Sequence, residues 1–391
     1  MTDVSADLAL ARRLLARLVA FPTVSRDSNL PLIAWVGDWL AGQGIASVRV
    51  PNADGKKASL YVGIGPDVPG GVMLSAHSDV VPVDGQAWSS DPWTLTGRGG
   101  RLYGRGTCDM KGFLALMLAA VPLAQAAGVK RPLQLAISYD EELGCTGVIP
   151  MAAEVAARLP RAQAVIVGEP TRMKVVTAHK GGTAFHVHVK GYEVHSSLLH
   201  QGVSAVLEAG RLIQWINEAN DANRAKAPGA VAAMFDPPWT TMAVGMIHGG
   251  TADNILARDC RLTAEMRVVP GESQDGWAAA FEAQARAVEV AMRAVRPEAG
   301  ITLDRYFDLP AFRPEPGGKA EALARRLTGD NATHAVSYGT EASHFQAQGY
   351  SVVVCGPGDI EQAHQADEYL EESEIAAGLR FMERLVTELA A

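Results

Sequence analysis

The chain has 391 residues, enough for roughly two or three folded units, so a single small module is excluded. Hydrophobic residues make up 48% and charged residues 20%, which excludes a disordered, collagen-like or coiled-coil protein. The 35 Lys and Arg residues are outnumbered by 43 Asp and Glu residues, and no dense basic cluster occurs. This charge pattern argues against binding to nucleic acid or to an anionic membrane, and we expect a small-molecule partner.

The cysteines and the N-terminal residues bear on location. Cys108, Cys145, Cys260 and Cys355 are too far apart for a C-x-x-C pair, so we expect free thiols in a reducing cytoplasm. The first apolar run contains arginines, unlike the core of a signal peptide. The most apolar stretch, residues 113–123, is much shorter than the roughly 18 residues of a membrane span. We therefore expect a cytoplasmic protein that does not cross a membrane.

Strand and helix patterns alternate through most of the chain. Helical spacing occurs at residues 5–20, and a second helix follows in PLIAWVGDWLAGQG. Further helices are expected at 112–127 and 149–159. Short apolar runs predict buried strands near residue 60 and at 71–76, 133–138, 164–168 and 351–356. This alternation predicts an α/β domain with a mixed, largely parallel sheet covered by helices on both faces.

A different pattern begins near residue 181. It predicts a strand at 183–192, a helix at 203–217, strands at 240–250 and 260–269, a helix at 277–295 and a strand at 300–307. This order is that of a split βαβ, ferredoxin-like α+β unit. We therefore expect a discontinuous catalytic domain of residues 1–180 and 312–391, with residues 181–311 as an inserted domain. The segments NEANDANRAKAPGA and DLPAFRPEPGGK are expected to be exposed connections.

Side chains that bind metals follow the end of each expected strand of the α/β domain. A His-x-Asp triplet or a glutamate pair is a weak signal when taken alone. Sites in open α/β sheets form at the carboxyl ends of strands, so these side chains are expected to meet in one crevice. The residues, in chain order, are His77, Asp79, Asp109, Glu141, Glu142, Glu169 and His364.

The ligand types indicate two divalent metals. Imidazole and carboxylate ligands without thiolate suit zinc, cobalt or manganese, and two histidines with three carboxylates are too many for one open zinc site. They suit two ions about 3.5 to 4 Å apart with a bridging carboxylate. We predict that His77, Asp109 and Glu169 bind the first ion, and that Asp109, Glu142 and His364 bind the second.

Two acidic residues remain beside this ligand set. Asp79 is expected to hold the second ring nitrogen of His77 and so to fix the tautomer of the imidazole. Glu141 is left free to act as the general base, since hydrolysis at two metals needs a group that carries a proton. The alternative is that Glu141 is only the exposed neighbour of a ligand.

Several segments carry a family resemblance over essentially the whole chain. They are SAHSDVVPVDGQAWSSDPW, RLYGRGTCDMKG, DEELGCTG, GEPT, GYEVHSS, YGTEASHF and GPGDIEQAHQADEY. Together they resemble the co-catalytic zinc amidohydrolases, a family that includes acetylornithine deacetylase, succinyl-diaminopimelate desuccinylase, aminoacylase and glutamate carboxypeptidases. The pairing of GTEA with the last segment most resembles the acetylornithine deacetylases.

The resemblance implies a zinc exopeptidase-like catalytic domain with the same five ligands, zinc or cobalt as the metals, and Glu141 as the base. It also implies a cis peptide bond between Asp109 and Met110. The inserted domain would be a lid that mediates a homodimer. On the lid, His195 matches a family histidine that stabilises the oxyanion at the neighbouring subunit's metal site.

The resemblance further implies four substrate-binding positions, Asn254, Arg267, Gly339 and Thr340. Arg258 stays an alternative to Arg267 as the carboxylate anchor, and His195 could act within its own subunit or across the dimer. The implied reaction is the hydrolysis of an N-acyl amino acid, foremost N2-acetyl-L-ornithine to L-ornithine and acetate. A desuccinylase, another N-acyl amino acid or dipeptide hydrolase, and a non-catalytic metal-stabilised binding protein remain alternatives.

Overall fold

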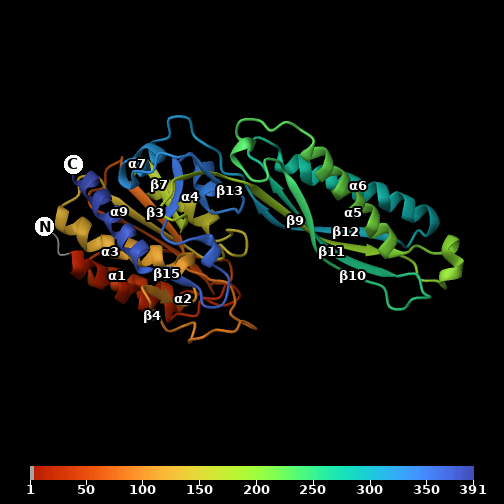
Figure 1. Cartoon of the computed structure of the whole chain (residues 1–391), viewed down its shortest axis with the longest axis horizontal. Coiled ribbons are helices and arrows are strands. Elements are labelled where there is room, and N and C mark those ends of the chain that lie inside the picture. The colour runs from red at the N-terminus through yellow and green to blue at the C-terminus, as the bar shows by residue number, and fades with distance from the viewer. Residues whose placement is uncertain (1–3) are drawn as a thin grey trace. The chain divides into compact units, whose positions relative to one another are not determined.

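The computed structural model describes residues 4–391, which form two compact units. The first runs to Thr177 and resumes at Pro314–His334 and Thr340–Ala391, and the second comprises Ala178–Arg313 and Ala335–Gly339. The first unit therefore joins segments that are far apart in the sequence, as the red and blue ends of the chain in Figure 1 show.

An eight-stranded mixed sheet has the strand order β1-β2-β6-β3-β7-β14-β8-β13. Its four central strands β6, β3, β7 and β14 run parallel, whereas β1, β2 and β8 pair antiparallel with their neighbours. The predicted mixed, largely parallel sheet is thus confirmed. The strands are β1 (Val48–Pro51), β2 (Ala58–Ile64), β3 (Val72–His77), β6 (Leu133–Ser138), β7 (Ala164–Pro170), β8 (Val176–His179), β13 (His334–Val336) and β14 (Val352–Gly356).

Helices cover this sheet. Figure 1 shows α1, α3 and α9 side by side, and they share one apolar core with alternate residues of the central strands, such as Leu74 and Ile166. The helix α4 packs on β2 and β6. The predicted helices at 5–20, 112–127 and 149–159 are present within one residue. The helices of this unit are α1 (Val4–Val19), α2 (Leu30–Gly42), α3 (Gly112–Ala127), α4 (Val148–Arg158), α7 (Lys319–Thr328), α8 (Ala342–Ala347) and α9 (Glu372–Ala390).

A small three-stranded sheet, which the sequence patterns did not predict, lies beside this layer. Its order is β15 (Tyr369–Glu371), β5 (Arg101–Tyr103) and β4 (Thr96–Arg98). Strands of three residues are too short to show a clear hydrophobic period. The pairing of Tyr369 with Tyr103 places the C-terminal segment next to the π-helical turn η1 (Thr107–Lys111) that follows β5.

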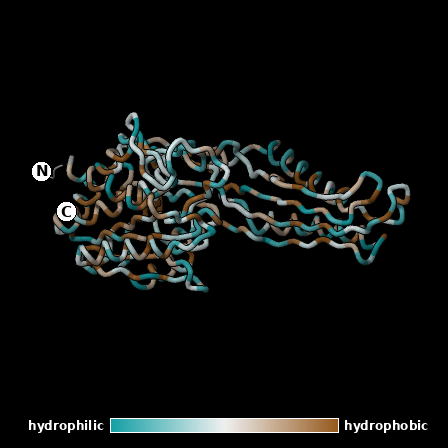
Figure 2. Tube along the Cα trace, turned by 90° about the horizontal axis from the view of Figure 1, so that it is seen from below, coloured by the Kyte–Doolittle hydropathy of each residue, from teal (hydrophilic) through white to brown (hydrophobic). Residues whose placement is uncertain are grey.

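The second unit has an antiparallel sheet of order β10-β11-β9-β12 with α5 and α6 packed on it. Buried and more exposed residues alternate along β11 and along the second half of β9, and Figure 2 shows alternating hydropathy in this unit. The predicted ferredoxin-like order of strands and helices is therefore present. The elements are β9 (Gly181–Lys190), η2 (Ser196–Gln201), α5 (Ala205–Arg224), η3 (Ala232–Met234), β10 (Thr241–Gly249), β11 (Asp259–Val268), α6 (Gln274–Val295) and β12 (Gly300–Leu309).

One expected connection is wrong in part. The helix α5 continues to Arg224, through residues that the sequence pattern assigned to an exposed segment. The amide of Asn220 bonds both the N–H and the carbonyl of Met242, and Asn223 donates to the carbonyl of Thr240. These contacts with the residues that begin β10 hold the polar end of the helix, and local propensity could not reveal them.

One helix is apolar enough to resemble a membrane span. The segment of residues 107–127, which comprises η1 and α3, is long and apolar enough to cross a membrane, although its backbone is not helical at Asp109 and Met110. The apolar run that we noted in the sequence is shorter. Within this segment, 78% of an apolar stretch of 18 residues is buried, in the core that α1 and α9 share with the sheet. This burial is typical of a core helix.

The close approach of β14 to β7 generates a stability prediction. A Cβ atom on Gly356 would lie 2.0 Å from the carbonyl oxygen of Gly168 and 2.7 Å from that of Glu169. Backbone atoms cannot yield, so we expect Gly356→Ala to lower the free energy of unfolding by about 1–3 kcal/mol, as overpacking does. Urea denaturation measures this. Gly42→Ala is the control, because its Cβ would meet no atom within 4 Å; equal midpoints for the two variants would contradict the prediction.

Candidate metal centre

Neighbouring parallel strands bring the predicted ligands together at one edge of the sheet. His77 ends β3, Glu169 lies near the end of β7, and the loop after β6 carries Glu142. Since β3 lies between β6 and β7, these three side chains start from adjacent strand ends. Asp109 comes from η1, which packs against β3 and β7. The expected convergence at the carboxyl edge is present in the structure.

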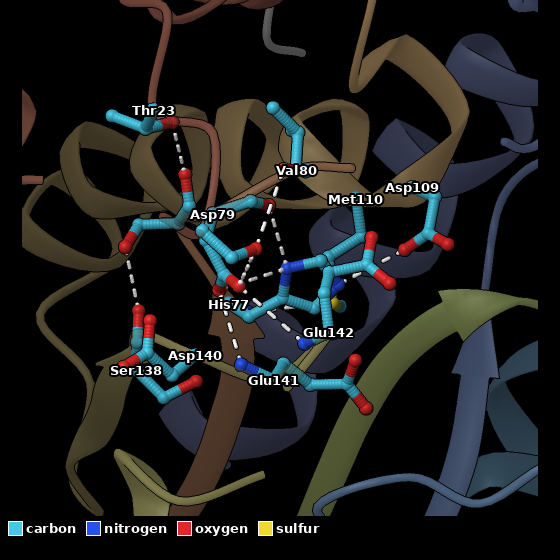
Figure 3. A network of polar contacts seen from close by, with 12 residues as sticks. Thr23, His77, Asp79, Val80, Asp109, Met110, Ser138, Asp140, Glu141 and Glu142 are labelled. Carbon is cyan, nitrogen blue, oxygen red and sulfur yellow. Dashed lines mark hydrogen bonds and ion pairs between the residues drawn. The ribbon is translucent and has the colours of Figure 1, made fainter. Parts of the chain in front are cut away.

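Asp109 lies between the two histidines. One of its carboxylate oxygens is 2.9 Å from Nε2 of His77, and the other is 3.1 Å from Nε2 of His364. The same nitrogen of His364 is 3.2 Å from Glu142, and Nε2 of His77 is 3.9 Å from Glu169. Figure 3 shows His77, Asp109 and Glu142 gathered in one place. All five predicted ligands therefore belong to one cluster, with Asp109 at its centre.

The donor atoms of this cluster fit divalent cations. Two groups, one of His77, Asp109 and Glu142 and the other of His77, Glu141 and Glu169, have ligand atoms within 4.8 Å of one another. One carboxylate oxygen of Glu142 and one of Glu169 are buried and have no hydrogen-bond partner among residues 4–391. A buried carboxylate oxygen without a donor is costly unless a cation pairs with it. This geometry overlaps the division into two ligand sets expected from the sequence, but it also brings Glu141 within reach.

Burial and mutual charge perturb the acidic groups of the cluster. Burial raises the pKa of Glu169 and Glu142, and the negative charge of Asp109 adds to both shifts. Although burial opposes it, hydrogen bonding to His364 and His77 holds the pKa of Asp109 below its usual range. Hydrogen bonds to Asp109 and Glu142 raise the pKa of His364 to about 10. A positive charge among these carboxylates would therefore stabilise their ionised forms.

Asp79 contacts His77 in a different way from the one expected. The closest partner of the His77 Nδ1 atom is the backbone carbonyl of Asp79 at 2.9 Å, whereas its carboxylate lies 3.6 Å away. The Asp79 carboxylate accepts hydrogen bonds from the Ser25 hydroxyl at 2.7 Å and from the backbone N–H groups of Glu141 and Glu142 at 3.2 and 3.4 Å. The carboxylate therefore holds the loop that carries the two glutamates while it also faces Nδ1 of His77.

Glu141 points its carboxyl group away from Asp79, as Figure 3 shows. One of its oxygens accepts a hydrogen bond from the Cys145 thiol at 3.2 Å. Burial raises the pKa of Glu141 to about 8, and the charges of Glu142 and Asp109 add to the shift against the opposing effect of His77. A carboxyl group with a pKa near neutrality is suited to accept and to return a proton.

Two cysteine thiols lie near the site, and burial favours their neutral form over the thiolate that binds metals. Cys108 and Cys145 are free and buried, and burial raises the pKa of both thiols well above its usual value. All four cysteines of the chain are free and buried, as expected from their spacing. The bond between Asp109 and Met110 is a cis peptide, as the resemblance implied.

Two polar contacts beneath the site were missed by sequence reasoning. Glu341, which is fully buried, accepts hydrogen bonds from the hydroxyl groups of Ser75 and Ser138, on strands β3 and β6. Lys57 pairs with Asp140, the residue before Glu141, at 2.5 Å. Glu341 stands in the GTEA segment that carried the family resemblance, but nothing in its local pattern indicated these partners 203 and 266 residues away.

The other predicted site residues lie apart from this cluster in sequence and mostly in the second unit. His195 is exposed at the start of η2, where Nδ1 lies 2.8 Å from the Ser197 hydroxyl. The carbonyl of Asn254 accepts from Ser196, and Arg267 on β11 pairs with Glu265 at 2.5 Å. Gly339 also belongs to the second unit.

Thr340 belongs to the first unit and is buried. Its hydroxyl accepts a hydrogen bond from the N–H of Ala342, at the start of α8. The contacts of His195, Asn254 and Arg267 given above all lie within the second unit.

Comparisons with known proteins agree with this site. Residues 73–388 match the family model described as peptidase family M20/M25/M40. The chain is 36% identical over 380 residues to an acetylornithine deacetylase of Myxococcus xanthus, covering 94% of each protein.

Solved structures show the same fold. The M20 family metallo-carboxypeptidase Sso-CP2 from Sulfolobus solfataricus superposes with a TM-score of 0.79 at 15% identity, over 97% of this chain and 99% of that one. Human carnosine dipeptidase 1 gives a TM-score of 0.76 at 16% identity, over 99% and 98%. With a family match over most of its length and a cluster of donor atoms that fits divalent cations, the chain belongs to peptidase family M20/M25/M40 and is a metal-dependent hydrolase of amide bonds.

Proposed function

We propose that the protein removes the acyl group from an N-acyl amino acid, and that its substrate is N2-acetyl-L-ornithine. The products are acetate and L-ornithine, and this hydrolysis is a step of arginine biosynthesis. The observation that carries this proposal is the buried cluster around Asp109, combined with 36% identity to an acetylornithine deacetylase over 94% of both chains. Four free, buried cysteines support placing this enzyme in a reducing cytoplasm.

In this proposal the cluster holds two divalent ions, zinc or cobalt. His77 and Glu169 would hold one ion, Glu142 and His364 would hold the other, and Asp109 would contribute to both. The position of Asp109 between the two imidazoles supports a bridging role. The exposed fraction of the His364 side chain, 48%, leaves this side of the site open to substrate. When bound, such ions polarise an amide carbonyl and lower the pKa of water toward about 7.

Glu141 carries the proton in this reaction. It takes a proton from the attacking water and later delivers one to the nitrogen of the departing amino acid. The carboxyl group of Glu141 lies beside the ligand atoms of His77 and Glu169, which supports this role. The nearness of Glu141 to His77 and Glu169 would also allow it to be a ligand, and only the metal content of a variant separates the two roles.

The inserted domain of residues 181–311 completes the site as a lid and mediates a homodimer. On it, His195 stabilises the negative charge that develops on the carbonyl oxygen, and Asn254 and Arg267 bind the substrate. Gly339 and Thr340 bind its carboxylate end through their backbone. The exposure of His195, the residue before η2, supports a role in contacting a molecule outside its own unit.

Metal removal and a substrate panel test the proposed reaction. We expect the chelated protein to lose activity, to keep its secondary structure by circular dichroism, and to regain activity with Zn²⁺ or Co²⁺. The reconstituted enzyme should prefer acetylornithine over acetylcitrulline and succinyl-diaminopimelate in kcat/KM. Unfolding on chelation, with no hydrolysis of any substrate before it, would instead indicate a metal-stabilised binding protein.

The role of Glu141 is tested by Glu141→Gln, which keeps the shape of the side chain but cannot carry the proton. We expect kcat to fall by about 10²- to 10⁴-fold while both metals stay bound. Steady-state kinetics and elemental analysis measure the two effects. Glu154→Gln is the control, since Glu154 pairs with Arg158 on the exposed side of α4. Loss of a metal ion from the Glu141 variant would show that Glu141 is a ligand.

His195 is tested by His195→Ala. Loss of one group that stabilises an oxyanion costs about 10²- to 10³-fold in kcat, and metal content should not change. His200→Ala is the matched control, because His200 is an exposed histidine of the same turn η2. A kcat equal to that of the control would exclude His195 from the reaction.

A further inference from the structure

A buried carboxylate outside the ligand set holds the backbone around Asp109. Glu368 is 1% exposed, and it precedes β15. One of its oxygens accepts hydrogen bonds from the backbone N–H groups of Cys108 and Asp109, at 2.9 and 3.1 Å. The other accepts from the N–H of Gly106 at 3.1 Å. Three contacts of one side chain thus fix the turn η1, from which Asp109 projects.

The same carboxylate forms a buried ion pair. Arg105 is also 1% exposed, and its guanidinium donates to Glu368 at 2.6 Å. A second guanidinium nitrogen lies 2.5 Å from the side-chain oxygen of Gln86. The amide nitrogen of Gln86 in turn donates to the backbone carbonyl of His364 at 2.9 Å. The chain of contacts therefore runs from the backbone of Asp109, through Glu368, Arg105 and Gln86, to the backbone of His364.

Stability alone does not account for this buried ion pair and its hydrogen bonds. Burying an ion pair contributes little net stability, because desolvation offsets the attraction between the charges. Here the Glu368 carboxylate accepts three hydrogen bonds from backbone N–H groups of one short segment. Both ends of the chain of contacts terminate on residues whose side chains lie 3.1 Å apart in the cluster, Asp109 and His364.

We propose that Glu368, Arg105 and Gln86 form a positioning clamp that sets the separation of Asp109 and His364 for metal binding. The proposal rests on the proposed function, since it assigns the clamp to the two ions of that site. Residues that orient ligands in this way typically change metal affinity about 10- to 100-fold when they are mutated. None of the three clamp residues contacts substrate or metal in this proposal, so they act through the ligands.

Glu368→Gln tests the clamp. The amide has one oxygen, and its NH₂ group must face either the backbone donors or Arg105, so the turn loses at least one acceptor. We expect Zn²⁺ affinity, measured by titration calorimetry on the chelated protein, to fall by about 10- to 100-fold. The absorption spectrum of the Co²⁺-substituted protein should also change. Glu371→Gln is the matched control, because Glu371 ends β15 and pairs with Arg101 on β5. Within residues 4–391 its carboxylate has no hydrogen bond to the backbone of residues 106–109.

Gln86→Ala keeps the proposal testable if the Glu368 variant does not fold. Gln86 is only partly buried, so its loss should leave the fold intact while it frees the backbone of His364. We expect about tenfold weaker Zn²⁺ binding. Asp84→Ala is the control in the same loop, since Asp84 pairs only with Arg26 among the described ion pairs.

The outcomes separate the clamp from the proposed function. A wild-type protein that binds no metal would overturn the proposed function. A wild type that binds metal, with Glu368→Gln and Gln86→Ala variants that bind it within twofold of their controls, would overturn the clamp alone. A lower unfolding midpoint of the metal-free Glu368 variant with unchanged metal affinity would also overturn it, because the pair would then serve stability only.

Discussion

The electrostatic constraint at Asp109 governs the organisation of the first unit. Its carboxylate is buried between two imidazoles, and two further acidic side chains lie against the same histidines. Acidic groups this close in a medium of low polarity repel one another and favour neutral forms, unless positive charge lies among them. The oxygens of Glu142 and Glu169 without donors are therefore a sign of cation binding and not a packing fault.

The surrounding structure also restrains the backbone of the ligands. Asp79 accepts hydrogen bonds from the N–H groups of Glu141 and Glu142, and Glu368 accepts from those of Cys108 and Asp109. A carboxylate that accepts two or more backbone donors fixes the direction in which the next side chain leaves the chain. The two acids thus have parallel roles, and both are almost fully buried.

Much of the fold and the ligand set could be predicted from the sequence. Strands β3, β6 and β7 appear as continuous apolar runs because they are buried on both faces, and His77 and Glu169 stand out as polar residues at their ends. The role of Asp79 was predicted less well. The sequence places Asp79 two residues from His77. In the structure the backbone carbonyl of Asp79 lies 2.9 Å from the imidazole and its carboxylate lies 3.6 Å away. Spacing along the chain cannot tell which of these two groups comes closer.

The sequence by itself determined the alternation of strand and helix, the inserted α+β unit and the kinds of side chain at the strand ends, because hydrophobic period and residue type are local properties. Only the tertiary structure decided which carboxylate meets which imidazole, that α5 extends to Arg224, and that Glu368 holds a turn 259 residues earlier in the chain. Those contacts join segments that the chain brings together only when it folds, and no local pattern encodes the partner.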